Sequence, residues 1–358
     1  MWRNRHVALW RNLAALVSPV GAGERRQTPN VGNDWLQIAQ LATAQLIGPS
    51  LHATMKSRGL SSIVEPDVWK ALEAVHTLNA MRNDHFHSIL RDTVQVLNHV
   101  GIRPLLLKGA IALLPGQYQF AGARMLGDLD IGVQRHEVHA ANTALCAAGF
   151  DDTQLGLACY DNHHHLPPLL HPSRAAYIEI HKELLGVSVP ASALSLQMLL
   201  DGAQSVYWEG VQVLVPTLEH RMLHNALHQQ IQDRGYYTGH VRLRQLLEFA
   251  QLAASHEAAL IDWPRLLAPL DATGLGDSVR LLFLLSHDLF GQPLPVGILP
   301  NSAAAAQSRV WFRIKHRRLS DLRDSFASMP SRLPHLHKRL LTPGWYPAKY
   351  RHLRDKLL

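Results

Sequence analysis

The chain has 358 residues, 47% of them hydrophobic, so it is long enough for two compact domains or for one core with a large helical surround. Two cysteines are too few for a disulfide framework, which favours a reducing, cytoplasmic location. No run of about 18 uninterrupted apolar residues is present, which argues against a transmembrane helix and a membrane partner. Arg11 and Asn12 interrupt the first apolar run, so a secretory signal peptide is not expected either.

The first part of the chain predicts helices. Residues 1–33 are rich in Arg, Asn, Gly and Pro and are expected to form a flexible N-terminal segment. Residues 35–58 place apolar side chains three or four positions apart, as a helix does, with Pro49 expected to break or kink it. A longer helix is predicted from about 68 to 100. Residues 34–100 are therefore interpreted as an N-terminal helical region.

The pattern changes after residue 100, where short apolar runs predict strands. The predicted strands cover residues 103–107, 126–133, 158–170 and 175–181. A helical turn is expected at 110–114, and residues 137–148 predict a helix that ends at Gly149. Residues 101–190 are interpreted as a small α/β core.

After Pro190 the chain is expected to return to helices. These are predicted near residues 192–203, 218–232, 241–254 and 277–289. Residues 191–305 are interpreted as a C-terminal helical region. The predicted fold class is α+β, with a small mixed-sheet core flanked by N-terminal and C-terminal helical regions.

The last segment, residues 306–358, is strongly basic. From Arg309 to Leu358 there are 13 Lys or Arg against 3 Asp, about +10, so the rest of a chain with net charge +7 is slightly acidic. Aromatic residues such as Trp311 and Tyr346 are interleaved with these cations. Such a mixture can bind RNA or DNA, so nucleic acid is a predicted partner of this segment. The alternative interpretation is a solvated basic helix face.

Residues 127–133 carry two carboxylates within a predicted strand. Alternate strand residues share a face, so Asp128 and Asp130 point one way while Leu129 and Ile131 point the other. The two aspartates lie about 6–7 Å apart along the backbone. Burying two like charges without a cation is unfavourable, so this pair implies either exposure to water or a divalent metal.

Glu179-Ile180-His181 repeats that alternation on a later predicted strand. Glu179 and His181 share one face, while Ile180 packs behind. If this strand lies beside the Asp128 strand, Glu179 completes a cluster of three carboxylates. Such a cluster suits Mg²⁺, or Mn²⁺, which prefers oxygen ligands and shares its coordination shell with phosphates.

Lys108 and Gly109 stand where a predicted strand turns into a helix. Glycine lets a phosphate approach the backbone, and a helix N-terminus favours anions. Lys108 and Arg124 flank the carboxylates in sequence and are candidate triphosphate contacts.

Among the 23 histidines of the chain, two groups are candidates for the site. On a strand, His163 and His165 would share a face and could position an acceptor or act as a base; the alternative is a polar strand edge or loop. His224 and His228 have the spacing of a helical zinc pair, but Asn225 stands where a zinc peptidase needs glutamate. A structural or substrate-cleft position is favoured for the second pair.

Taken in order, these motifs resemble the DNA polymerase β-like nucleotidyltransferase superfamily. More narrowly, the chain resembles the bacterial family of uncharacterised nucleotidyltransferases, nucleotidyltransferase family 5, over roughly residues 34–320. The resemblance is carried by Leu106-Leu107-Lys108-Gly109, Arg124, Asp128-Leu129-Asp130 and Glu179-Ile180-His181. One departure is Ala110, because the superfamily usually has Gly-Ser or Gly-Gly at positions 109 and 110.

The resemblance implies transfer of a nucleoside monophosphate from an NTP, such as ATP, to an acceptor hydroxyl or phosphate. It implies that Asp128, Asp130 and Glu179 are catalytic metal ligands. It also implies nucleotide contacts from Lys108, Gly109, Arg124 and His181. The acceptor stays open among a small molecule, a protein or peptide, and tRNA.

Three alternatives to this function remain. One is a non-catalytic protein of the same fold that binds nucleic acid through residues 306–358. Another is transfer of phosphate or pyrophosphate instead of a nucleotide. The third is a nucleotide-sugar glycosyltransferase using Asp-x-Asp, which usually needs a longer doubly wound region before that motif.

Overall fold

A computed structural model describes residues 2–19, 29, 31–120, 122–152, 163–186, 188–299, 303–316 and 319–320. In this part of the chain, seven strands form one mixed sheet in the order β3-β4-β5-β2-β1-β7-β6. The strands are β1 (Leu105–Leu106), β2 (Leu129–Gly132), β3 (Asp151–Asp152), β4 (Leu169–Leu170), β5 (Tyr177–His181), β6 (Gln204–Trp208) and β7 (Val211–Val215). β2 pairs with β5 and β1 with β7 in parallel, and the other neighbours are antiparallel.

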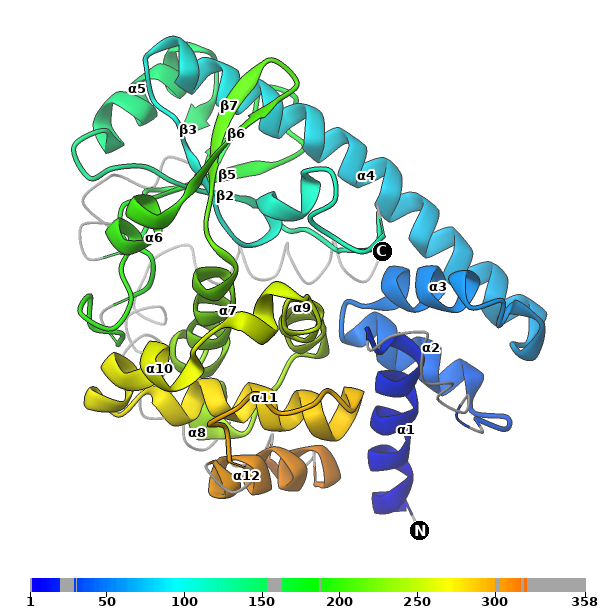
Figure 1. The fold of residues 1–358 in the computed structure, drawn as a ribbon. Coiled ribbons are helices and arrows are strands. Elements are labelled where there is room, and N and C mark those ends of the chain that lie inside the picture. The colour runs from blue at the N-terminus through cyan, green and yellow to red at the C-terminus, as the bar shows by residue number, and fades with distance from the viewer. Residues whose placement is uncertain are drawn as a thin grey trace, which may run out of the picture.

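Helices surround this sheet, so the α+β prediction is confirmed (Figure 1). They are α1 (Trp2–Val17), α2 (Trp35–Ala44), α3 (Gly48–Ser57), α4 (Pro66–His99), α5 (Val138–Ala147), α6 (Leu196–Gly202), α7 (Leu218–Leu227), α8 (Gly235–Thr238), α9 (Leu243–Ala253), α10 (Trp263–Ala272), α11 (Gly276–Phe290) and α12 (Ala304–Lys315). Short helical turns are η1 (Ser61–Ile63), η2 (Lys108–Leu113), η4 (His228–Gln232) and η5 (Glu257–Leu260). No helix among the described residues combines the length and apolar content of a membrane span.

Two hydrophobic clusters divide the interior. One joins the second half of α4 and α5 to one face of the sheet, and it includes Leu129 and Ile131. The other joins α1–α3 to the C-terminal helices α7, α9 and α11. Helix α4 contributes to both, through Phe86 to the first cluster and Leu72 to the second. In Figure 1 the sheet lies above the C-terminal helices, and α4 runs along one side.

The prediction of a flexible N-terminal segment is wrong for residues 2–17, which form α1. Leu13 and Leu16 are fully buried, and α1 contacts α2, α3, α11 and α12. The cation of Arg11 lies over the ring of Trp311. The average composition of residues 1–33 obscured the apolar side of this helix. Residues 1, 20–28 and 30 lie outside the described residues.

The region after Pro190 was predicted to be helical, and this prediction is wrong in part. The region also contains the β6–β7 hairpin. The signal was present in the sequence, because Val206 and Trp208 alternate with polar residues before Glu209-Gly210. Both turn residues have positive φ, 46° and 86°, which a two-residue hairpin of this hand requires. β7 joins the sheet beside β1, so the sheet continues beyond residue 190, where the predicted core ended.

Other differences concern where elements begin and end. The helix predicted over 35–58 is two helices, since Leu46 takes a left-handed conformation between them and Pro49 lies in the first turn of α3. Helices α10 and α12 were not predicted. Of the strand predicted over 158–170, residues 158–162 lie outside the described residues. The remainder gives β4 and an isolated bridge from His165 to His181. The division into five segments stays a prediction.

Candidate active site

The pairing of β2 with β5 sets the centre of the site. The two strands are parallel, and Asp130 stands directly opposite Glu179 in the register. Ile131 and Ile180, one residue on, are opposite each other and fully buried in the apolar cluster. The expected alternation is therefore confirmed for these residues, because Leu129 and Ile131 face the hydrophobic core. The two carboxylates share the other face of the sheet.

Asp130 is nearly inaccessible, with 2% of its surface exposed, yet its carboxylate has two close nitrogen partners. The Lys108 Nζ lies 2.6 Å from Asp130 Oδ1, and the His181 Nε2 lies 2.8 Å from the same oxygen. Burial alone would raise the pKa of Asp130. The charge of Lys108 and the hydrogen bond from His181 outweigh burial and hold that pKa well below its ordinary value.

The neighbouring carboxylates show the opposite behaviour. Burial, followed by the charges of Asp130 and Asp128, raises the pKa of Glu179 to about 7. Burial and the charge of Asp130 also raise the pKa of Asp128. Asp128 lies one residue before β2 and lines the same cavity as the other two. Three carboxylates crowded in this way repel one another, and a bound cation would relieve that repulsion.

The atoms that could bind a metal come from two strands. One ligand atom each of Asp130, Glu179 and His181 lies within 4.8 Å of the others. Asp128 is outside this group and contributes from the cavity wall. His181 is fully buried against Asp130, and its contact with a nucleotide stays a prediction. Two carboxylates and an imidazole suit Mn²⁺ and also Mg²⁺, since both accept oxygen ligands and Mn²⁺ accepts nitrogen as well.

The turn after β1 positions the cation of Lys108. Leu107 N donates to Asp130 O at 3.1 Å, and Lys108 then takes a left-handed φ of 45° at the start of η2. At Gly109 a Cβ would collide with the guanidinium of Arg124 and with Leu126. A larger residue at position 109 would therefore require the side chains of Arg124 and Leu126 to move. Ala110 is fully buried in the apolar cluster, so position 110 faces away from the cavity's solvent.

Arg124 is held between the sheet and the C-terminal helices. Its Nε and Nη2 donate to Glu248 Oε1 and Oε2 on α9, at 3.2 and 3.1 Å. Asn79 and Asn83 of α4 donate to its backbone oxygen at 3.0 and 2.9 Å. The side chain of Arg124 is 8% exposed and that of Glu248 is 17% exposed. The sequence did not identify Glu248 as the partner, because the two residues are separated by 124 positions.

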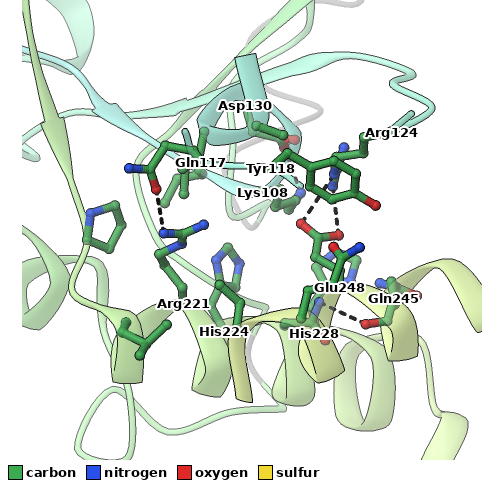
Figure 2. A pocket seen from close by; sticks show the side chains of 18 of the residues that line it. Lys108, Gln117, Tyr118, Arg124, Asp130, Arg221, His224, His228, Gln245 and Glu248 are labelled. Carbon is green, nitrogen blue, oxygen red and sulfur yellow. Dashed lines mark hydrogen bonds and ion pairs between the residues drawn. The ribbon is translucent and has the colours of Figure 1, made fainter. Parts of the chain in front are cut away.

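The cavity between these elements has a volume of about 880 Å³. Figure 2 shows Lys108 and Asp130 on its sheet side, and Arg221, His224 and His228 on its helical side. The position of His224 and His228 in the wall agrees with the cleft position expected for them. Burial lowers the pKa of His224 well below its ordinary value and that of His228 to about 4, so both rings are neutral at pH 7.

Two further guanidinium groups that the sequence did not single out line this cavity. Arg221 Nη1 donates to Gln117 Oε1 at 2.7 Å, and Arg244 Nη1 donates to Met125 O at 2.7 Å (Figure 2 for Arg221). Burial lowers the pKa of both guanidinium groups. In the described part of the chain, neither forms an ion pair with a carboxylate, whereas Arg124 and Arg242 do. Among the described residues, the cavity therefore contains two guanidinium groups, those of Arg221 and Arg244, without an ion-pair partner.

Comparison with known proteins places this site in a family. No curated protein and no solved structure matches the chain. A family model described as an uncharacterised nucleotidyltransferase matches residues 32–291, most of the chain, and includes all the residues of the β2–β5 site. The chain therefore belongs to this family of uncharacterised nucleotidyltransferases and is an enzyme of the nucleotidyltransferase class.

Proposed function

We propose that the protein transfers a nucleoside monophosphate from an NTP to an acceptor hydroxyl or phosphate in a reaction that depends on Mg²⁺ or Mn²⁺. The observation that carries this proposal is the register of β2 and β5, which sets Asp130 opposite Glu179 in a cavity that Asp128 also lines. We assign the divalent cation to these three carboxylates, because Mg²⁺ and Mn²⁺ prefer oxygen ligands. Family membership supports the NTP as substrate, and ATP is one candidate.

When bound, the cation would offset the charge of the triphosphate and of the oxygens at the reacting phosphorus. The acceptor oxygen forms a bond to the α-phosphorus while the bond to pyrophosphate breaks. We assign Glu179 to accept the proton that the acceptor oxygen loses. His181 holds Asp130 in place through the 2.8 Å contact.

The triphosphate requires cations on the protein. We retain Lys108, Gly109 and Arg124 as predicted contacts, but Arg124 is already neutralised by Glu248. Arg221 and Arg244 have no carboxylate partner among the described residues, and both line the cavity. A buried guanidinium without a paired anion is stabilised by a phosphate, because it donates two parallel hydrogen bonds. We therefore add Arg221 and Arg244 to the proposed triphosphate contacts.

The acceptor and the location of the enzyme stay predictions. A small molecule, a protein or peptide, and tRNA all remain acceptor candidates. Nucleic-acid binding through residues 306–358 rests on charge and aromatic content, and residues 317–318 and 321–358 lie outside the described residues. A cytoplasmic location rests on the low cysteine count alone.

The test measures transfer of a radioactive phosphorus label from each NTP to a product. In one series the NTP carries the label at the α-phosphate, and in another it carries the label at the γ-phosphate. The purified protein is incubated with a lysate of the source cell, with Mg²⁺, with Mn²⁺ or with a chelator. Label from the α-phosphate should move to a discrete product only when a divalent cation is present. The product's sensitivity to ribonuclease and to protease then distinguishes the acceptor classes.

Two variants make the test specific. Asp128→Asn with Asp130→Asn should abolish transfer, while Asp151→Asn removes an exposed carboxylate outside the cavity and should leave transfer unchanged. Movement of γ-label instead would establish phosphate transfer. No transfer of either label by the folded protein would favour the non-catalytic alternative, and nucleic-acid binding through residues 306–358 would then be measured.

A further inference from the structure

Beside the carboxylates lies a group of imidazoles. His163, His164 and His165 precede β4, and the His165 backbone forms an antiparallel bridge with His181 of β5. The ring centroids of the three consecutive histidines lie 4.2 to 4.8 Å apart. The rings of His164 and His165 lie 5.3 and 5.4 Å from the ring of His181. Consecutive residues in an extended chain point to opposite sides, so this gathering departs from an ordinary strand.

The orientation of His165 is that of a metal-binding histidine. Its Nδ1 lies 2.6 Å from Leu166 O, and a carbonyl oxygen can only accept, so Nδ1 carries the hydrogen. A hydrogen bond of this kind from one ring nitrogen to a backbone oxygen is what usually fixes a ligating imidazole. The other nitrogen, Nε2, points to Glu179 Oε2 at 3.6 Å. Nε2 is thus the ring nitrogen that a cation would bind, and it faces the carboxylate site.

The donor atoms of the three histidines are close enough to share an ion. One ligand atom from each lies within 4.8 Å of the other two. Two nitrogen ligands of a tetrahedral zinc ion lie ~3.4 Å apart, given bonds of about 2.0–2.1 Å. The histidine nitrogens would therefore have to move closer together to share one ion. His163 is exposed and His164 is half-buried, so an ion can reach the group from solvent.

We propose that His163, His164 and His165 form a second cation site, for a borderline divalent ion such as Zn²⁺, next to the carboxylate site and separated from it by Glu179. Imidazole nitrogens favour zinc and similar ions over magnesium, whereas carboxylate oxygens favour magnesium and manganese. The two neighbouring sites therefore differ in the ion they select. The histidine site does not depend on the proposed transfer reaction, because it concerns ion binding alone.

The full-length protein is first stripped of metal with a chelator. It is then titrated with Zn²⁺ in a buffer that contains a large excess of Mg²⁺ and no nucleotide. Isothermal calorimetry gives the number of ions and the affinity. We expect one tightly bound Zn²⁺ that excess Mg²⁺ does not displace. Combined substitution His163→Ala, His164→Ala and His165→Ala should weaken binding by more than about 100-fold, beyond the loss that follows removal of one supporting hydrogen bond.

Two variants serve as controls, and a third replaces the triple variant if that protein does not fold. His139→Ala removes an exposed histidine on α5 and should leave zinc binding unchanged. Asp128→Asn with Asp130→Asn should also bind zinc normally, although it should lose nucleotidyl transfer. If circular dichroism shows that the triple variant does not fold, the pair His163→Ala and His164→Ala leaves His165 in place, and its zinc affinity is measured instead.

Three results would overturn the proposal. The wild-type protein could bind no Zn²⁺, the folded histidine variant could bind it with unchanged affinity, or the aspartate variant could lose it as fully as the histidine variant does. The last result would place zinc on the carboxylates. Because no nucleotide is present, each result is independent of whether nucleotidyl transfer itself is observed.

Discussion

The two faces of β2 are equally well shielded from water but are stabilised in different ways. On one face Leu129 and Ile131 are fully buried among apolar side chains of α4, α5 and β5. On the other face Asp130 is 2% exposed, and its neighbours are Lys108, His181 and two further carboxylates. Burial therefore does not distinguish the core from the site. The difference is that the polar face gathers charged side chains, to which we assign a divalent cation.

A substitution on the polar face should affect the reaction far more than the fold. Asp130→Asn should lower the rate of nucleotidyl transfer by at least about 1,000-fold, or about 4 kcal/mol, because a proposed metal ligand loses its charge. Lys108 loses a buried ion-pair partner but still has Glu179 and Asp128 nearby, so we expect thermal stability to fall less than transfer does. Steady-state rates test the expected loss of transfer, and melting temperatures test the expected effect on the fold. Asp151→Asn is the control for both measurements. Near wild-type transfer by this variant would remove Asp130 from the mechanism.

A substitution on the apolar face should do the reverse. Leu129→Ala removes a fully buried side chain and should lower the free energy of unfolding by about 3 kcal/mol, through lost burial and a cavity. Urea unfolding measures this as a lower midpoint with an unchanged m-value. The fraction that remains folded should transfer nucleotide at close to the wild-type rate. A folded but inactive Leu129→Ala protein would show that the two faces are not independent.

The ion pair of Arg124 and Glu248 resembles the polar face in its charge and the apolar face in its contribution to stability. It joins the segment before β2 to helix α9. Glu248→Gln should lower the free energy of unfolding by about 2 kcal/mol, below the range for fully buried pairs because Glu248 is 17% exposed. Replacing both partners, Arg124→Met with Glu248→Leu, should recover part of that loss, since no charge is left unpaired. The comparison is made by chemical denaturation. A single variant as stable as the wild type would show that the pair does not hold α9 to the sheet.

The sequence predicted what depends on local alternation. Asp130, Glu179 and the hydrophobic side chains behind them lie on the faces that a strand period of two assigns to them. The three-carboxylate cluster required that the strand of Glu179 lie beside the strand of Asp130. The pairing of β5 with β2 meets this requirement. The family resemblance was likewise confirmed by the match over residues 32–291.

What the sequence could not supply was long-range pairing. Glu248 neutralises Arg124 from 124 positions away, and Arg221 and Arg244 reach the cavity from helices whose periodicity reports only their apolar sides. The β6–β7 hairpin is different, because its alternation and its Glu209-Gly210 turn can be read from the sequence. Helix α1 does not stand out in the average composition of residues 1–33, because it covers only residues 2–17 of that segment.

The smallest expected effect lies on the helical side of the cavity, where His224 is buried and neutral. Burial lowers its pKa well below the ordinary value, so the folded ring stays unprotonated while the unfolded ring takes up a proton below about pH 6.5. The unfolded state then binds more protons, and stability present at neutral pH is lost as the pH falls through 6.5. Between pH 7.5 and 5.5, the wild-type protein should lose about 1 kcal/mol more stability than His224→Gln does. Denaturant unfolding at several pH values measures this, and Leu129→Ala, which changes no titratable group, should keep the wild-type dependence. Equal pH dependence in the wild type and His224→Gln would mean that the buried ring accepts a proton without unfolding, for which the carboxylates across the cavity would have to provide the compensating charge.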